Sequence, residues 1–133
     1  MKTLLDEQLD IRIQSELHEF EVFTLRDFNW LGMKNGELRE KINQNGFDFF
    51  LSADKNLPFQ QNFDKINFMV GLLDTPSLLW QTQKLFTPKI LDFLKNPPDN
   101  RPKIVHFSVE NLSKGRKSEA LKALVGAENI LFI

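Results

Sequence analysis

Short runs of apolar residues, each followed by polar or turn-forming residues, divide the chain into candidate strands. Apolar runs bounded by such signals are typical of buried strands. The run over residues 47–53 is apolar along most of its length, as expected of a parallel strand that is covered on both faces. The predicted strands are Thr3–Leu5, Val22–Leu25, Phe47–Ala53, Ile66–Leu73 and Lys103–Phe107.

Segments with helical spacing or helix-capping signals lie between these runs. Threonine followed by proline is typical of a helix start, and a glycine such as Gly46 is typical of a helix end. The closing segment Ile130–Ile133 is apolar and predicts an edge strand or a contact with a partner. The predicted helices are Gln8–Glu19, Asn35–Gln44, two consecutive pieces that begin at Thr75-Pro76 and at Thr87-Pro88, and a short one within Ser113–Val125 that Gly126 ends.

Strands that alternate with helices at this spacing predict βαβ units and a mostly parallel sheet. We therefore expect an α/β protein with a three-layer, Rossmann-like fold. A chain of 133 residues fits one domain. We expect that domain over residues 1–108, followed by a C-terminal extension over residues 109–133 that packs on the domain or on a partner.

Composition and charge narrow the class of protein. Hydrophobic residues make up 41% of the chain and charged residues 26%, as in ordinary globular proteins. A formal net charge of −1 argues against a protein that holds nucleic acid by bulk electrostatics alone. Cysteine is absent, which excludes disulfides and thiolate metal sites. No apolar run is long enough for a membrane span or a signal peptide, so we expect a cytoplasmic protein.

Three carboxylates fall where this architecture places function. Asp6 ends the first predicted strand, Asp54 ends the third, and Glu37 lies in the first turn of the helix that follows the second. Ligands of open parallel sheets bind at the carboxyl ends of the strands. Converging acids repel one another unless a cation lies between them, and Mg²⁺ or Mn²⁺ prefers carboxylate oxygen. We therefore predict a metal site that activates water for attack on a phosphodiester.

Each acid also has a purely structural interpretation, which the sequence leaves open. Asp6 is also a suitable helix N-cap, and Glu37 is a favourable charge at a helix N-terminus. Asp54 is a typical turn residue. It is the coincidence of the three at one edge of one sheet that favours a functional site.

Three segments of the chain resemble a bacterial PIN-like family of unknown function. They are Leu4-Leu5-Asp6-Glu7, then Gly32-Met33-Lys34-Asn35-Gly36-Glu37-Leu38, then Phe50-Leu51-Ser52-Ala53-Asp54-Lys55-Asn56-Leu57-Pro58, with Gln60-Gln61-Asn62 behind the last. The family is related to the toxin nucleases of toxin–antitoxin pairs and to the Mut7-C domain. The resemblance spans roughly residues 2 to 107, and the third segment is the most specific.

The resemblance implies a PIN-type fold and Mg²⁺- or Mn²⁺-dependent cleavage of single-stranded RNA, with an antitoxin protein as a partner. Asp6, Glu37 and Asp54 match the family's metal-binding and catalytic acids. This chain departs from the pattern at Asn56, where many active relatives have a further acid, and at Asn35, where some have aspartate. A site with fewer carboxylates is expected to hold one ion instead of two, or to hold it weakly.

Basic and aromatic residues supply further candidates. Lys55, Arg26 and Lys34 lie on neighbouring predicted loops and are candidates, with Asn56, for contacts to RNA phosphates, although such residues are more often solvated surface charges. Trp30 and Trp80 are candidates for stacking on bases, with Trp80 expected in a helix–sheet contact. His18 and His106 lie far apart in sequence, which argues against a zinc site.

Two other functions remain open. A response-regulator receiver would use Asp54 as phosphoacceptor and Asp6-Glu7 to bind Mg²⁺, but it needs a lysine at the end of the fifth strand. Here Lys103 lies at the start of that strand. Alternatively, the fold is an inactive binding module that acts through a protein partner. The basic, apolar-ended tail from Ser113 to Ile133 suits contact with a partner or a second copy, and suits a helix packed on the domain equally well.

Overall fold

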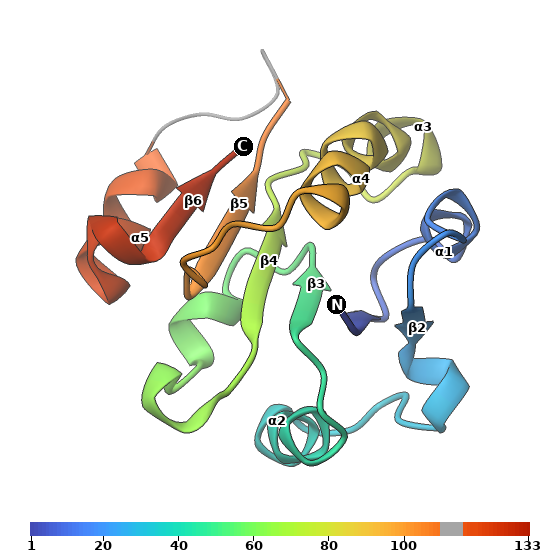
Figure 1. Cartoon of the computed structure of the whole chain (residues 1–133), viewed down its shortest axis with the longest axis horizontal. Helices are drawn as coiled ribbons and strands as arrows, with labels where there is room; N and C mark the ends of the chain where they lie inside the picture. The colour runs from blue at the N-terminus through green and yellow to red at the C-terminus, as the bar shows by residue number, and fades with distance from the viewer. Residues whose placement is uncertain (110–115) are drawn as a thin grey trace.

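The computed structural model describes residues 1–109 and 116–133, and six strands from these ranges form a single sheet in the order β2-β1-β3-β4-β5-β6 (Figure 1). Every neighbouring pair is parallel. The prediction of an α/β fold with a mostly parallel sheet is confirmed. The strands are β1 (Thr3–Leu5), β2 (Val22–Thr24), β3 (Phe49–Ser52), β4 (Met69–Leu73), β5 (Ile104–Phe107) and β6 (Ile130–Phe132).

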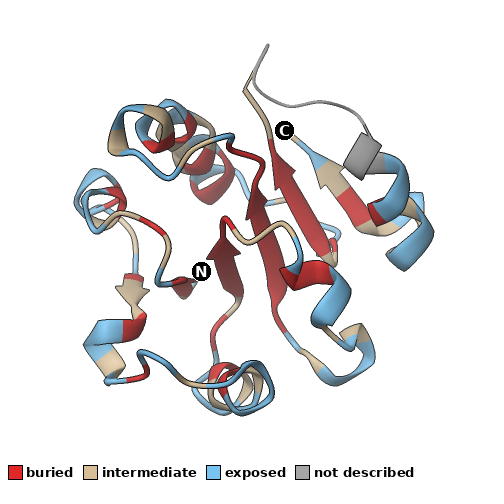
Figure 2. Cartoon of the chain, turned by 180° about the vertical axis from the view of Figure 1, so that it is seen from behind, coloured by how far each residue is buried: buried red, intermediate tan, exposed pale blue. Residues whose placement is uncertain are grey.

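Helices cover both faces of the sheet, which gives three layers. The helices are α1 (Arg12–Glu16), α2 (Asn35–Gln44), α3 (Trp80–Gln83), α4 (Thr87–Lys95) and α5 (Arg116–Val125). Alternate strand residues point to opposite faces. Leu5, Phe49 and Leu51 therefore pack with α1 and α4, while Leu4 and Phe50 pack with α2 on the other face. The strands at the centre of Figure 2 are buried throughout.

Side chains of β3 occupy the space beside Gly71 of the neighbouring strand β4. A Cβ placed on this residue would lie 2.5 Å from a ring carbon of Phe49 and 2.8 Å from a methyl carbon of Leu51. Phe49 is fully buried and in turn contacts Phe93 of α4. Glycine at this position therefore lets the large side chains of β3 fill the core between the sheet and α4.

The sequence predicted the position of most elements. The fourth strand, expected from Ile66, begins at Met69, and two helices differ more. The helix expected over Gln8–Glu19 is confined to Arg12–Glu16. The helix expected to begin at Thr75-Pro76 begins only at Trp80, because the Thr75 hydroxyl donates to the Ser77 carbonyl and closes a turn there. Both segments adjoin the same edge of the sheet.

The C-terminal part of the chain continues the sheet. β6 pairs in parallel with β5, as the edge-strand prediction for Ile130–Ile133 required. α5 packs through buried Leu121 against Ile104 and Ile130. Residues 110–115, including Ser113 and Lys114 of the predicted basic segment, lie outside the described residues. In the described part of the chain no helix has the length and apolar character that crossing a membrane requires.

Candidate active site at the carboxyl edge of the sheet

The candidate site lies where the chain reverses its direction across the sheet. From β1 the chain passes to β2 on one side, and β3 then pairs with the other side of β1. Open parallel sheets bind ligands at such a switch point, outside the carboxyl ends of the strands. Asp6 directly follows β1, and Asp54 lies two residues beyond the end of β3. The two predicted acids thus flank the switch point.

Asp6 is buried, with 9% of its surface exposed. Its Oδ1 accepts the backbone N–H of Glu7 at 2.8 Å, and its Oδ2 accepts the hydroxyl of Ser52 at 2.7 Å. The backbone N–H of Asp6 donates to the Leu51 carbonyl at 2.9 Å. Neighbouring strands therefore fix the Asp6 carboxylate in one orientation. Asp6 is not the N-cap of the first helix, because the residue before α1 is Ile11.

Ser52 connects the two acids. It is fully buried, and its Oγ also accepts the backbone N–H of Asp54 at 3.0 Å. Asp54 itself is half-buried, and its Oδ1 accepts the N–H of Asn56 at 3.0 Å. A single hydroxyl thus links the Asp6 carboxylate to the Asp54 backbone.

Burial and neighbouring negative charges dominate the electrostatics of Asp6. Burial raises the pKa of Asp6 above its ordinary value, and the negative charges of Glu7 and Asp54 raise it further. The hydrogen bonds from Ser52 and from the Glu7 backbone oppose this rise but do not cancel it. A cation between Asp6 and Asp54 would favour the charged form of Asp6, because it would offset both the cost of burial and the repulsion between the carboxylates.

Glu37, the third predicted acid, lies on α2 but on its exposed side. Asn35, Leu38 and Arg39 line a small pocket together with Asp6. Because helix residues are spaced by about 100°, Glu37 projects roughly opposite to Asn35. The helix therefore presents Asn35 rather than Glu37 to the pocket beside Asp6.

Among residues 1–109 and 116–133, no three acidic or imidazole side chains lie close enough together to hold a metal ion. The prediction of a three-carboxylate site at Asp6, Glu37 and Asp54 thus reduces to a pair of aspartates. A pair still fits Mg²⁺ or Mn²⁺, because Mg²⁺ usually takes one or two carboxylates and completes its shell with water and substrate phosphate. Oδ2 of Asp54 accepts no hydrogen bond from the described residues and is available as a ligand.

A second polar cluster, which the sequence did not reveal, lies beyond β3 at the ends of β4 and β5. Asp74 is buried, and its Oδ1 lies 3.4 Å from Nζ of Lys55. Its Oδ2 lies 3.3 Å from Nε2 of His106, and burial lowers the pKa of that histidine. Asp74 follows a buried strand just as Asp6 does, and this is the signal that could have identified it.

The structure places the other predicted contact residues differently. Lys55 pairs with Asp74 rather than extending freely, and Asn56 orients Asp54 through its backbone. Arg26 is exposed beside a pocket near Asp6, and Lys34 is exposed just before α2.

The two tryptophans differ in environment. Trp30 is buried and stacks on Phe28 with ring centroids 4.6 Å apart, so its face is occupied by protein. Trp80 packs partly buried against the core, as expected, and the Arg12 guanidinium lies 4.8 Å from the centre of its ring.

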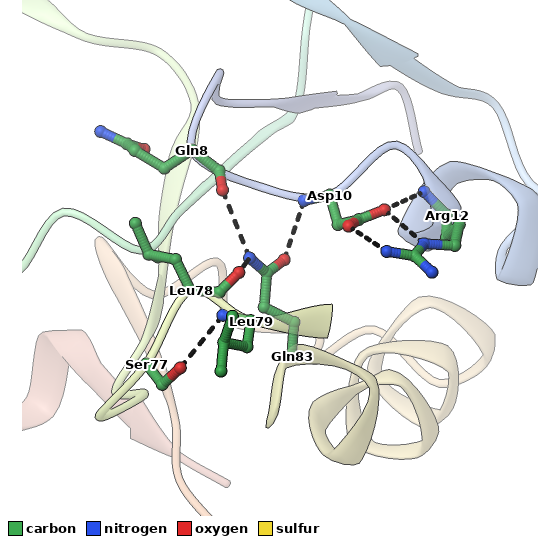
Figure 3. Close-up of polar contacts among 7 residues, drawn as sticks. All are labelled: Gln8, Asp10, Arg12, Ser77, Leu78, Leu79 and Gln83. Atoms are coloured by element: carbon green, nitrogen blue, oxygen red, sulfur yellow. Dashed lines mark hydrogen bonds and ion pairs between the residues drawn. The ribbon is translucent and has the colours of Figure 1, made fainter. Parts of the chain in front are cut away.

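Gln83 ties the segment after β1 to the segment after β4. The Gln83 side chain is 1% exposed and forms three hydrogen bonds to main-chain atoms (Figure 3). Its Oε1 accepts the N–H of Asp10 at 2.8 Å. Its Nε2 donates to the carbonyls of Leu78 at 2.7 Å and Gln8 at 3.3 Å. This amide pairs with main-chain groups of the non-helical segment that precedes α1, and it ties the loop after β1 to the segment before α3.

Comparisons of the chain with protein-family models, with curated proteins and with solved structures found no match.

Proposed function

We propose that this protein is a divalent-metal-dependent ribonuclease of the PIN-like type that cleaves single-stranded RNA, with Asp6 and Asp54 as the ligands of Mg²⁺ or Mn²⁺. The observation that carries the proposal is the pair of acids at the switch point, joined through Ser52. Asp6 is buried with a raised pKa and the negative charge of Asp54 close by. Perturbed carboxylates in such a position are typical of functional sites.

The donor set suits the proposed chemistry. A divalent cation at the pair would lower the pKa of a bound water and neutralise charge that develops on a phosphodiester. Asp6 is held on both oxygens before any ligand arrives, while Asp54 keeps one oxygen free. A site with two carboxylates leaves the remaining coordination positions to water and to the RNA phosphate.

Cleavage of a fluorescent single-stranded RNA is expected to require Mg²⁺ or Mn²⁺ and to fall at least about a hundredfold in Asp54→Asn. Lewis-acid stabilisation by a bound metal contributes several kcal/mol, and each 1.4 kcal/mol is about tenfold in rate. The measurement is the initial cleavage rate with metal and with EDTA.

Asp64→Asn serves as the matched control for this assay, because Asp64 is an exposed aspartate that does not belong to the acid pair. It should cleave like the unmodified protein. Equal rates for Asp54→Asn and the unmodified protein, or cleavage that persists in EDTA, would contradict the proposal.

A second candidate function is a protein-binding module, for instance the partner of an antitoxin. Exposed apolar side chains at the same edge of the sheet favour it, since Ile11, Leu78 and Leu79 are all exposed. The Gln83 amide holds the two segments that carry them together (Figure 3). A module of this kind would show no metal-dependent cleavage in the assay above.

A receiver-like phosphoacceptor has weaker support. The order β2-β1-β3-β4-β5 is shared by receivers, and Asp54 is at the equivalent of their acceptor position. Where a receiver has lysine, at the end of β5, this chain has His106 and Phe107, followed by Ser108. Labelling of Asp54 by acetyl phosphate would favour this function over the nuclease.

A further inference from the structure

A pocket adjoins the acid pair on the side of β1 and β2. Its volume is about 210 Å³, and it lies over the carboxyl ends of these two strands. Its walls are largely aliphatic, formed by Leu9 and Ile11 from the segment after β1 and by Leu25 and Leu31 from the segment after β2. Leu9 and Leu25 are buried, whereas Ile11 and Leu31 are exposed at the mouth.

Three charged residues also line this pocket, and they differ in sign and in surroundings. Asp6 lines it together with the exposed carboxylate of Glu7. Arg26 is exposed and forms no ion pair or hydrogen bond through its side chain with the described residues. The pocket thus offers a cation, carboxylate acceptors and apolar walls to one ligand.

The volume of the pocket suits a ligand of intermediate size. It is far larger than the roughly 10–15 Å³ that a water molecule requires, and smaller than the 300–1,000 Å³ typical of pockets for drug-sized ligands. A group of one ring system fits this range. Flat bases taken out of a stack are commonly held between apolar side chains by contacts on both faces.

We infer that this pocket binds one unpaired nucleotide of a single-stranded RNA, with the base between the aliphatic walls and a phosphate on Arg26. The choice of ligand rests on the proposed ribonuclease function. Arginine is well suited to phosphate oxygens, and carboxylates accept hydrogen bonds from base amino groups. Glu7 therefore favours a base with an exocyclic amino group over uracil. Because Asp6 borders both the pocket and the acid pair, a nucleotide bound here places its phosphate chain next to Asp54.

This arrangement explains selectivity for single strands. A base in a duplex is stacked on both faces, and its pairing edge is occupied by the opposite strand. Such a base reaches neither the walls formed by Leu25 and Leu31 nor the carboxylate of Glu7. Duplex RNA of the same sequence is therefore expected to bind much more weakly than the single strand.

The test is the affinity of the full chain for a short fluorescein-labelled single-stranded RNA, measured by anisotropy in EDTA so that no cleavage occurs. Leu31→Glu places a negative charge at the mouth of the pocket and is expected to raise Kd at least about tenfold. Arg26→Gln should raise Kd severalfold. It should also reduce the slope of log Kd against log salt concentration by the amount expected for about one phosphate contact. Leu124→Glu is the control, because Leu124 is 40% exposed on α5 and Leu31 is 48% exposed.

Loss of binding in Leu31→Glu but not in Leu124→Glu supports the pocket. Unchanged binding in Leu31→Glu, or no binding by the unmodified protein, overturns it. The two proposals can fail separately. If the protein shows metal-dependent cleavage and Leu31→Glu does not weaken it, the pocket proposal is wrong and the nuclease proposal stands. If Leu31→Glu abolishes RNA binding but the unmodified protein cleaves no RNA with Mg²⁺ or Mn²⁺, the nuclease proposal is wrong and the pocket proposal stands.

Discussion

Replacing Asp6 with asparagine is expected to abolish RNA cleavage and, without divalent cations, to stabilise the fold. The loss of cleavage follows from removal of a metal ligand and should be at least about a thousandfold. The gain in stability follows from the buried, uncompensated charge of Asp6, whose pKa is raised by burial and by Glu7 and Asp54. The amide also fits locally, because the Ser52 hydroxyl can turn to donate to Gln8 Oε1, which lies 3.3 Å away.

The pH dependence of stability gives this prediction a definite sign. The folded state holds the Asp6 proton to a higher pH than the unfolded state, since the pKa of Asp6 is raised on folding. In EDTA, the free energy of unfolding therefore falls as the pH rises from the ordinary pKa of an aspartate, near 4, through the raised pKa of Asp6 in the folded state. Below the ordinary pKa Asp6 is protonated in both states, and its contribution to the slope disappears.

Thermal unfolding of both proteins in EDTA across this pH range measures the effect. Asp6→Asn should unfold at a higher temperature than the unmodified protein at pH 7, and the difference should shrink on acidification. Added Mn²⁺ should stabilise the unmodified protein and leave Asp6→Asn unchanged. Asp99→Asn, at an exposed position, controls for the loss of one surface charge. A variant less stable than the unmodified protein at pH 7 in EDTA would show that Asp6 is structural.

Replacing Gln83 with alanine is expected to destabilise the fold by about 3–5 kcal/mol. The substitution removes the partner of the Asp10 N–H and of the Leu78 and Gln8 carbonyls in part-buried hydrogen bonds, and a lost partner costs about 1–3 kcal/mol where water does not reach the group. It also leaves a cavity between α3 and the loop after β1. Chemical denaturation measures the loss, and amide exchange at Asp10 should accelerate markedly.

Gln81→Ala is the matched control, because Gln81 lies on the same short helix but is exposed. Its effect should remain within about 0.5 kcal/mol. Similar destabilisation by the two variants would mean that helix propensity, rather than the buried amide, dominates the effect. Because Gln83 holds the loop that carries Asp6, its loss should also weaken Mn²⁺ binding in the protein that remains folded.

The sequence was most informative where one local rule governs the structure. Apolar runs located the strands, and the glycine signal placed the end of α2 correctly at Gly46, which adopts a positive φ of 69°. The turn at Thr75 could not be anticipated in this way. Its side chain donates to the Ser77 carbonyl, and a threonine before proline is compatible with either a turn or a helix start.

The site was less predictable because it depends on which way side chains face. Strand alternation and topology suffice to bring Asp6 and Asp54 to one edge. The facing of Glu37 depends on how α2 is rotated about its axis, which is set by burial of Leu38 and Ile42. Gln83 was not identified because a buried glutamine has the same local pattern as an exposed one. Two of its three partners, Asp10 and Gln8, lie more than 70 residues away in the sequence.

The central claim is that Asp6 and Asp54 together hold a divalent cation, and anomalous scattering from crystals soaked in millimolar Mn²⁺ tests it most directly. We predict an anomalous peak within coordination distance of Asp6 and Asp54 in the unmodified protein, and no peak in Asp6→Asn. An empty site in the unmodified protein, or a peak that persists at this position in Asp6→Asn, would contradict the claim.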